Sequence, residues 1–574
     1  MIFPNFDKVK TPWMRYMVGI PAHLDYPDGT MVEAMAQAAK DYPKLIAYDF
    51  MGGHTTYAKA MADIEACARA LRAAGVKEND RVTIAMPNTP QAISMFYAVN
   101  KVGAIANMIH PLSAEGEIEF YLNDSRSVAA LTLDQFYAKF AAIRRNTPQL
   151  KTLVIASVKD ALNPAMKLGY KLTAGRKVAR LPEDGDYISW GDFIENGKTF
   201  TGETTVPRRA NDPAVILYSG GTTGVTKGIL LSNLNFNALG KQIIATNPMF
   251  TPGDKMLTIM PMFHGFGLGV SVHSMLINGG RCVLVPRFTP QTYAKLLAKH
   301  HPNFIAGVPT LYEALLRLPN LEKLDLSCLK GMFSGGDTLP AELKKRIDAF
   351  LKEHKATIEV REGYGTTECV TASCLTPSGL AREGSIGIPF PDTYYKIVTP
   401  GTEIEAPYGT EGEICLAGPT VMLEYVNHPE ETANTLRTHA DGMTWVHTGD
   451  LGIMDSDGYI YFRQRIKRMI VTSGYNVYPS QIENLLDKHE YVHMSCVIGV
   501  KDPYKMQKVK AFIVLKPGIE PSDEVKKSIM DYCRKNIAKY ALPYDIEFRE
   551  DLPKTLVGKV AYRLLEEEER EKSA

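Results

Sequence analysis

Short apolar runs alternate with helix-like segments in the N-terminal part of the chain. The runs Val82–Met86, Ala104–Ile109 and Ala129–Leu133 have the length and composition of buried strands. Between them, Pro90–Val102 and Ala114–Asn123 have the length and apolar spacing of helices. Alternating strands and helices are typical of a mostly parallel sheet that helices cover on both faces.

The alternation resumes downstream, with strands predicted at Phe304–Val308 and Ile358–Arg361 and a helix at Leu311–Leu316. We therefore predict an α/β fold with two mostly parallel, covered sheets in a large N-terminal domain. The pattern then changes to short strands separated by turns, such as Gly412–Ala417 and a hairpin that turns at the Asp-Gly pair 457–458. These strands predict an additional antiparallel β module.

A strongly basic junction, RQRIKRMIVTSGYNVY, follows Phe462 and precedes roughly 110 residues with a compact strand and helix pattern. We place a domain boundary near Gln464, which gives an N-terminal domain of residues 1–463 and a small α+β C-terminal domain of residues 464–574. The acidic run Glu566–Arg570 is expected to be the solvated end of a helix.

Composition excludes several classes of protein. The chain has 65 basic and 64 acidic residues, a net charge of +1, which gives no case for nucleic acid as the main partner. Its eight cysteines are scattered without a C-x-x-C pair, as in a reduced cytosolic protein. The N-terminal residues lack the charged-then-apolar order of a signal peptide, and no apolar run reaches the roughly 18 residues of a spanning helix. We expect a cytoplasmic protein.

Residues 159–181 depart from the surrounding alternation of strands and helices, because six basic side chains are interleaved with apolar ones. A solvated surface insertion explains this composition. The alternative is a peripheral contact with the inner face of a membrane through the basic residues and an apolar side. Pro164 and Gly169 argue against one long helix here.

A Gly/Thr/Lys-rich loop in the segment Tyr218–Asn233 (YSGGTTGVTKGILLSN) lies between two predicted strands, Ala214–Leu217 and Gly228–Leu231. A Walker P-loop is excluded, because Gly228 follows Lys227 where Ser or Thr is needed and no helix opens there. The inward N–H groups of such a loop, with threonine hydroxyls and a lysine, suit a polyphosphate. An ordinary turn explains an isolated glycine cluster equally well.

Six further motifs follow along the chain, and each is weak by itself. They are PMFHGFG (261–267), GYGTTE (363–368), GSIGIPFP (384–391), HTGD (447–450), the basic junction with its continuation SGYNVYP, and PKTLVGK (553–559). Together with the Gly/Thr loop they resemble the motif series of the adenylate-forming superfamily over nearly the whole chain. VMLEYVNHPEET, SGYNVYPSQIE and the basic insertion near Lys167 look most like bacterial long-chain fatty acid CoA ligases.

The resemblance implies a role for each matching residue. Thr222, Lys227 and the loop amides would hold the ATP phosphates, and Glu368 would bind Mg²⁺. The nucleotide-binding set it implies is Ser219, Gly220, Gly221, Thr222, Thr223, Gly224, Thr226, Lys227, Gly335, Gly336, Tyr364, Gly365, Thr366, Thr367, Asp450, Arg465 and Lys559. Within this set Tyr364 would stack near adenine, and Asp450 would accept the ribose hydroxyls.

The resemblance also implies two half-reactions. A carboxylate attacks the α-phosphate of ATP, and CoA then opens the acyl-adenylate. Lys559, His264, Thr222 and Glu368 would be catalytic, with Lys559 bridging the carboxylate and the α-phosphate. The C-terminal domain would be mobile about a hinge at Lys467, and Gly474 would let pantetheine pass.

We therefore expect a ligase that converts a medium- or long-chain fatty acid to acyl-CoA with ATP, Mg²⁺ and CoA. Alternatives are a ligase for aryl or other bulky acids, transfer of acyl-AMP to a carrier protein and, less favoured, a non-catalytic acyl or nucleotide sensor. A homodimer is left open. The chain departs from the family pattern at Asp337, at Arg468, expected to make the junction more basic, and at Tyr562, where arginine is common.

Overall fold

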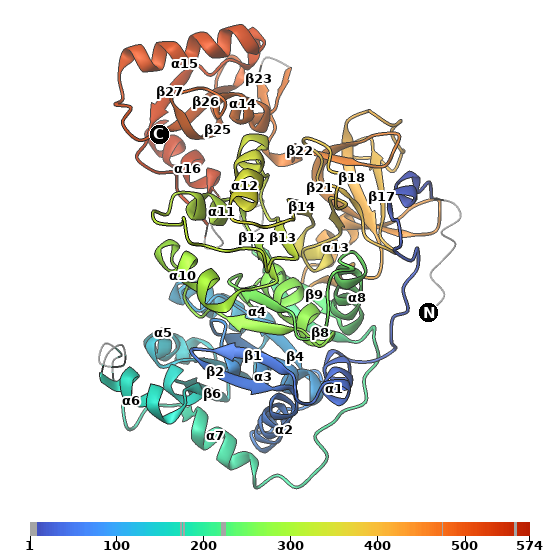
Figure 1. Cartoon of the computed structure of the whole chain (residues 1–574), viewed down its shortest axis with the longest axis vertical. Coiled ribbons are helices and arrows are strands. Elements are labelled where there is room, and N and C mark those ends of the chain that lie inside the picture. Colours follow the sequence, from blue (N-terminus) through green and yellow to red (C-terminus); the bar gives the residue numbers. More distant parts are fainter. Residues whose placement is uncertain are drawn as a thin grey trace. The chain divides into compact units, whose positions relative to one another are not determined.

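The computed structural model describes residues 9–172, 175, 178, 180–219, 226–472, 475–555 and 560–573. The chain forms two compact units (Figure 1). The first consists of residues 1–381, 387–394 and 417–446, and the second of residues 382–386, 395–416 and 447–574. The second unit therefore holds most of the β module as well as everything after residue 464. The domain boundary at residue 464 stays a prediction.

The first unit contains an eight-stranded sheet. Its strands in spatial order are β19 (Glu424–Tyr425), β9 (Lys227–Ser232), β8 (Pro213–Ser219), β4 (Ile105–Met108), β3 (Arg81–Ala85), β5 (Ala129–Leu133), β6 (Thr152–Ala156) and β7 (Ile188–Ser189). Strands β8 to β7 pair in parallel, whereas β9 pairs antiparallel with both β8 and β19. The predicted parallel sheet is confirmed.

A nine-stranded sheet is the second layer of this unit. Its order is β16 (Ile388–Pro389), β15 (Cys374–Leu375), β14 (Val360–Tyr364), β13 (Gly331–Ser334), β12 (Phe304–Gly307), β10 (Lys255–Thr258), β11 (Arg281–Leu284), β1 (Ile46–Phe50) and β2 (Gly53–Thr56). The strands from β14 to β1 are parallel. The β1–β2 hairpin was not predicted. The helix α2 (Tyr57–Ala73) begins directly after it, where the Thr56 hydroxyl accepts a hydrogen bond from Lys59 N and caps the helix.

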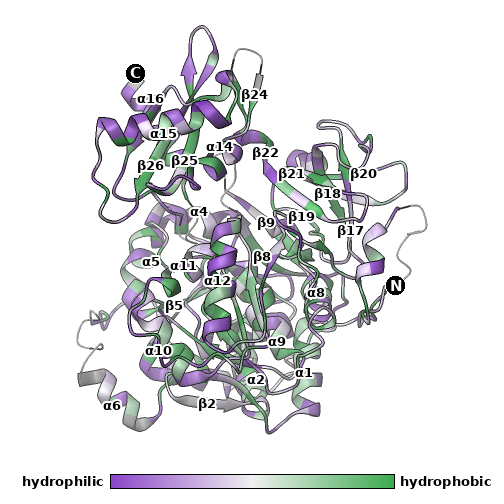
Figure 2. Ribbon diagram, turned by 45° about the horizontal axis from the view of Figure 1, so that its top comes forward, coloured by the Kyte–Doolittle hydropathy of each residue, from purple (hydrophilic) through white to green (hydrophobic). Residues whose placement is uncertain are grey.

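Helices cover both sheets, and one of them lies wholly inside the core. The helices of this unit are α1 (Met31–Asp41), α2 (Tyr57–Ala73), α3 (Pro90–Lys101), α4 (Glu115–Ser125), α5 (Tyr137–Ile143), α6 (Pro164–Leu172), α7 (Trp190–Gly197), α8 (Asn233–Ala245), α9 (Ser274–Leu276), α10 (Pro290–His300), α11 (Pro309–Leu316), α12 (Ala341–Glu353) and α13 (Pro429–Thr435). Residues 91–100 of α3 are buried on every face, as expected of a helix with few charges. One apolar core includes residues from both sheets, and Figure 2 shows hydrophobic strands beneath polar outer faces such as that of α12.

The second unit combines an antiparallel module with an α+β module. The first contains β17 (Tyr394–Val398), β18 (Gly412–Ala417), β21 (Thr444–Met454) and β22 (Ile460–Arg465), with β20 (Leu436–Thr438) beside the start of β21. The second contains β23 (Ile470–Thr472), β24 (Tyr475–Val477), α14 (Pro479–Leu486), β25 (Val492–Asp502), β26 (Met506–Leu515), α15 (Asp523–Asn536), β27 (Asp545–Phe548) and α16 (Tyr562–Ser573). The expectation of a solvated acidic run at residues 566–570 is wrong at Glu569, which is buried and lies 2.8 Å from Lys510 Nζ.

The segment predicted as an insertion at residues 159–181 contains α6, which begins at Pro164 because proline is tolerated in a first helical turn. Met166 and Leu168 are exposed there, and residues 173, 174, 176, 177 and 179 lie outside the described residues. Among the helices that the structure describes, none is both long enough and apolar enough to cross a membrane.

Candidate active site

Three segments with predicted site residues follow the carboxyl ends of parallel strands in one sheet: β10, β13 and β14, with β12 between β10 and β13. They therefore reach the same edge of the nine-stranded sheet, where ligands bind in open α/β sheets. His264 follows β10, Gly335 and Gly336 follow β13, and Tyr364 ends β14. A Cβ added to Gly335 would lie 3.2 Å from Gly363 O and 3.6 Å from the ring of Phe266, so the three loops are in contact.

Glycines make this contact possible. A Cβ on Gly365 would lie 2.4 Å from the carbonyl oxygen of Thr371, closer than a side chain can approach. A Cβ on Gly265 would lie 3.0 Å from Val370 O and 3.3 Å from Leu217 in β8. The loop with Thr366, Thr367 and Glu368 is thereby held against the PMFHGFG motif and the eight-stranded sheet.

His264 lies at the start of an unusual helical turn. Its Nδ1 accepts a hydrogen bond from the Phe266 N–H at 3.2 Å, and the following residues 266–273 form a π-helix. A Cβ on Gly267 would lie 2.1 Å from Pro261 O, so only glycine permits this turn. Short π-helical segments occur often at functional sites, because they turn side chains out of the regular register.

The Gly/Thr loop connects the antiparallel strands β8 and β9, with Ser219 opposite Lys227. The prediction of a loop between strands, without a following helix, is confirmed at both ends. Gly220, Gly221, Thr222, Thr223 and Gly224 lie outside the described residues. Thr226 is half-buried immediately before β9.

Lys227 and Glu368, which come from different motifs, lie on either side of Tyr425. Lys227 Nζ is 5.1 Å from the centre of the Tyr425 ring and 3.7 Å from Glu431 Oε1. The Tyr425 hydroxyl donates a hydrogen bond to Glu368 Oε1 at 2.7 Å. Tyr425 lies in the segment VMLEYVNHPEET, and nothing in the sequence assigned it a role. Its strand β19 pairs with β9, which brings it beside Lys227.

A buried carboxylate that the sequence did not single out lies below the Tyr364 loop. Glu362 Oε1 accepts a hydrogen bond from Leu339 N at 3.1 Å. Burial raises its pKa to about 7, and the Asp337 carboxylate adds to the rise. Asp337, a departure from the family pattern, thus helps to raise the pKa of Glu362, a carboxyl group below the Tyr364 loop.

Asp450, Arg465 and Lys467 belong to the second unit. Asp450 in β21 lies opposite Arg465 in β22, with 3.4 Å between Asp450 Oδ1 and Arg465 Nε. Asp450 is only 2% exposed, whereas the Arg465 side chain is 44% exposed. Lys467 lies in the short 3-10 turn Ile466–Arg468 that follows β22.

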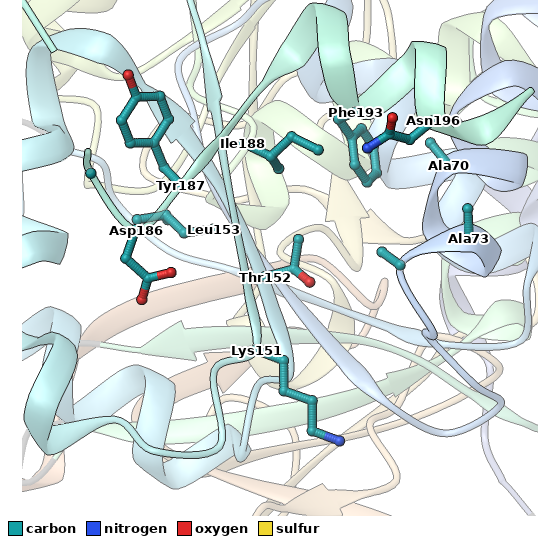
Figure 3. Close-up of a pocket in the computed structure, with 12 residues that line it drawn as sticks. Ala70, Ala73, Lys151, Thr152, Leu153, Asp186, Tyr187, Ile188, Phe193 and Asn196 are labelled. Carbon is teal, nitrogen blue, oxygen red and sulfur yellow. The ribbon is translucent and has the colours of Figure 1, made fainter. Parts of the chain in front are cut away.

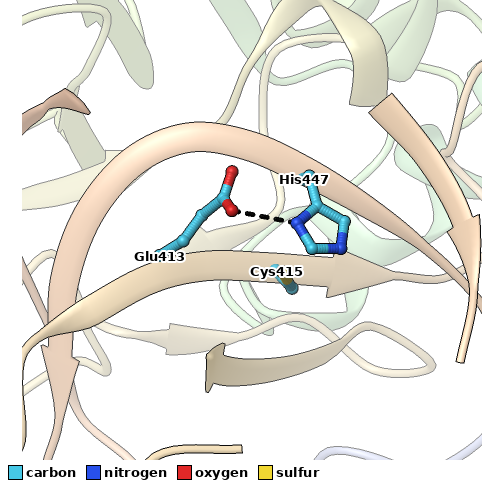
Figure 4. Close-up of side chains that lie close together, drawn as sticks. All are labelled: Glu413, Cys415 and His447. Atoms are coloured by element: carbon cyan, nitrogen blue, oxygen red, sulfur yellow. Dashed lines mark hydrogen bonds and ion pairs between the residues drawn. The ribbon is translucent and has the colours of Figure 1, made fainter. Parts of the chain in front are cut away.

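The HTGD segment of β21, which ends in Asp450, is braced by Glu413. One Glu413 oxygen lies 2.9 Å from His447 Nδ1, and the other accepts the Gly449 N–H at 2.9 Å (Figure 4). Cys415 lies beside this pair, and the three residues have the chemistry of metal ligands. Because both oxygens of Glu413 already contact nitrogen atoms of this β21 segment, the arrangement serves as a support for Gly449, which has a positive φ of 70°.

Gly474 and Lys559, whose predicted roles depend on the mobile C-terminal domain, lie outside the described residues. The loop that contains Lys559 is closed at its base, where Lys554 and Val560 form a β-bridge and Ala561 N donates to Pro553 O at 2.7 Å.

A cavity of about 360 Å³ lies elsewhere in the first unit, between α2, the start of β6 and α7 (Figure 3). Lys151, Thr152 and Asp186 line it, and none of the predicted site residues does. Lys151 and Thr152 are at the amino end of β6, so this cavity opens at the opposite strand end from the predicted site.

Sequence comparisons agree with this geometry. Residues 35–426 match the family described as AMP-binding enzyme, and residues 481–559 match the AMP-binding enzyme C-terminal domain. The chain belongs to the family of AMP-binding enzymes.

Its relatives are similar over their full length. A long-chain-fatty-acid–CoA ligase of Bacillus subtilis is 36% identical over 571 residues, covering 98% of both chains. A long-chain-fatty-acid–CoA ligase of Salmonella typhimurium is 32% identical, covering 98% of this chain and 99% of the relative. The crystal structure of an anthranilate CoA ligase with anthranoyl-AMP matches with a TM-score of 0.81 and 26% identity, covering 97% of this chain and 99% of that chain.

Proposed function

We propose that the chain is an AMP-forming acid–CoA ligase that activates a medium- or long-chain fatty acid. This proposal rests on one observation: Lys227 and Glu368 both contact Tyr425 beside the loop of the β8–β9 hairpin. It places a cation and a carboxylate beside a loop suited to a polyphosphate. The full-length similarity to two long-chain-fatty-acid–CoA ligases supports the choice of acid.

The reaction has two balanced steps. A fatty-acid carboxylate oxygen attacks the α-phosphorus of ATP, and the bond to pyrophosphate breaks to give acyl-AMP. The thiol of CoA then attacks the acyl carbon, releasing AMP and a proton to form the thioester. Lys227 and the loop N–H groups would stabilise charge on the phosphates in the first step, an effect worth roughly 3 kcal/mol per well-placed donor.

Glu368 fits a role as the Mg²⁺ ligand. It supplies the oxygen donors that this cation prefers, and a carboxylate that accepts one hydrogen bond from Tyr425 still has lone pairs for a metal. When bound, Mg²⁺ would neutralise phosphate charge. Asp450 would accept the ribose hydroxyls, His264 would lie beside the carboxylate, and Lys559 would bridge the carboxylate and the α-phosphate.

A panel of carboxylic acids scored for AMP formation, with and without CoA, tests this function. We expect AMP and acyl-CoA with medium- or long-chain fatty acids. Turnover only with aryl acids, or only with a carrier protein as acceptor, would replace the assigned substrate. If none of the acids leads to AMP formation, the chain would instead be a non-catalytic acyl or nucleotide sensor.

The two half-reactions are separable by two variants. Lys559→Ala should abolish ATP–pyrophosphate exchange while sparing thioester formation from supplied acyl-AMP, and Gly474→Leu should do the reverse. Equal loss of both half-reactions in each variant would contradict the alternation of the C-terminal domain.

We also propose that residues 159–181 contact an anionic membrane surface. Leu168, with a 63% exposed side chain, lies on α6 beside the exposed Lys167. Co-sedimentation with vesicles should decrease when the six basic residues are reversed or the anionic lipid is removed. Unchanged binding in both cases would mean that residues 159–181 are a solvated surface insertion.

A further inference from the structure

Arg468 directly follows the predicted hinge residue Lys467, and its side chain is only 18% exposed. Its guanidinium contacts both oxygens of Glu483 in α14, with Nη1 3.1 Å from Oε2 and Nη2 bonded to Oε1. Nη2 also donates to the carbonyl of Val497 in β25 at 3.3 Å. The expectation that Arg468 makes the junction more basic is therefore corrected, because Glu483 balances its charge.

This guanidinium also lies against the ring of Tyr562. The Arg468 Cζ atom is 4.8 Å from the centre of the Tyr562 ring, a distance typical of a cation–π contact. The two residues that depart from the family pattern at 468 and 562 are thus in contact. A planar guanidinium can stack on a ring and bind a carboxylate at the same time, which lysine cannot do equally well.

Tyr562 is the first residue of α16 and stands at the base of the loop that contains Lys559. The Lys554–Val560 bridge and the Ala561–Pro553 hydrogen bond close that loop immediately before Tyr562. Val560 and Tyr562 pack against one small core in the same module, and its buried members are Cys496, Ile498, Phe512, Val514, Leu552 and Leu565. One arginine therefore connects the hinge turn with the base of the Lys559 loop.

We propose that Arg468 is a positioning residue for the adenylation step. Through Tyr562 it fixes the Lys554–Val560 bridge and the start of α16 relative to the hinge turn, and the adenylation step depends on this fixed arrangement. Arg468 touches neither substrate in this role. The inference rests on the proposed function, since it uses the roles assigned to Lys467 and Lys559.

The test measures both half-reactions in the full chain: ATP–pyrophosphate exchange, and thioester formation from supplied acyl-AMP and CoA. Tyr562→Leu removes the cation–π contact, and Arg468→Lys keeps the charge but loses the planar group that stacks on the ring and binds Glu483 through two nitrogens. Each should lower exchange about tenfold, with thioester formation within about twofold of the parent. Tyr562→Phe keeps the ring and should retain exchange. Retained thioester formation also demonstrates that each variant is folded.

An exchanged pair provides a stronger check. Arg468→Asp alone places two carboxylates together and should reduce exchange more than Arg468→Lys does. Adding Tyr562→Arg returns a guanidinium that can face Glu483 from α16, and it should restore exchange to within about threefold of the parent. A double variant no better than Arg468→Asp would overturn the proposal.

Arg549→Lys is a matched control. Arg549 is also paired with glutamates, 2.6 Å from Glu568 and 2.7 Å from Glu547, and lies over the Phe512 ring, but it does not contact the hinge turn. Its variant should leave the ratio of the two half-reactions unchanged. Equal loss of both half-reactions in the Arg468 and Tyr562 variants would mean a purely structural role. Lys559→Ala with exchange intact would instead refute the function assigned to Lys559.

Discussion

Around Glu368 the chain is held by backbone atoms in close contact, whereas around Asp450 it is held by hydrogen bonds to one buried carboxylate. Gly365 allows the first arrangement, because any side chain there would meet Thr371 O. Glu413 makes the second, by contacting both His447 and Gly449. Close packing tolerates no added volume. A polar brace tolerates small changes of volume but not the loss of a charge.

The largest effect is expected where volume is added to the packed region. Gly365→Ala should lower the free energy of unfolding by roughly 3 kcal/mol and abolish ATP–pyrophosphate exchange, because the backbone at Thr371 must move. Thermal unfolding and the exchange assay measure this. Gly116→Ala, on α4 with open space around its Cβ, is the control and should be neutral or slightly stabilising. Equal effects of the two variants would refute the packing argument.

The packed region contains one group that should respond to pH. The pKa of Glu362 is raised by burial from 4.5 to about 7, so between these values only the unfolded state loses the proton. The free energy of unfolding therefore falls as pH rises through this window, by at most about 3 kcal/mol. Glu362→Gln should remove that slope and be more stable than the parent at pH 8.

Thermal midpoints at several values between pH 5 and pH 8 test this prediction. Glu353→Gln, at the exposed end of α12, is the control and should keep the slope of the parent. A Glu362→Gln variant with an unchanged slope would mean that this carboxyl titrates normally.

The polar brace should fail when its charge is removed. In Glu413→Gln the side chain keeps one carbonyl oxygen, so it can accept a strong hydrogen bond from only one of the two donors. The lost hydrogen bond costs roughly 2 kcal/mol. The KM for ATP should rise about tenfold, and the preference for ATP over 3′-deoxy-ATP should shrink, because Asp450 is less well held. Glu403→Gln, exposed in the same unit, is the control. If the KM rises but the preference for ATP over 3′-deoxy-ATP is unchanged, Glu413 does not act through Asp450.

The smallest effect is expected at Tyr425. Tyr425→Phe keeps the ring beside Lys227 but removes the hydroxyl that donates to Glu368, a contribution of roughly 1 kcal/mol. The Mg²⁺ concentration for half-maximal exchange should rise about threefold. Tyr504→Phe, at a 95% exposed tyrosine, should leave it unchanged. An identical Mg²⁺ dependence in both variants would remove Tyr425 from the site.

Local pattern was sufficient for elements whose apolar spacing matches their burial. β5 and β18 occupy the residues predicted from the sequence, Ala129–Leu133 and Gly412–Ala417. The β1–β2 hairpin was missed because its strands are short and mix polar with apolar residues. Its place in the sheet depends on the pairing of β1 with β11, which is distant in the chain.

The order of the motifs along the chain, and the adenylate-forming resemblance they carry, were determined by the sequence alone. Which residues meet was decided by the tertiary structure. Tyr425 reaches Glu368 because β19 pairs with β9, and Glu413 reaches Gly449 because β18 and β21 share a sheet. The sequence predicts that Arg468 makes the junction more basic, whereas folding places it, half-buried, against Glu483 and Tyr562. Charges are local properties of a sequence, but their partners come from long-range pairing that no local pattern encodes.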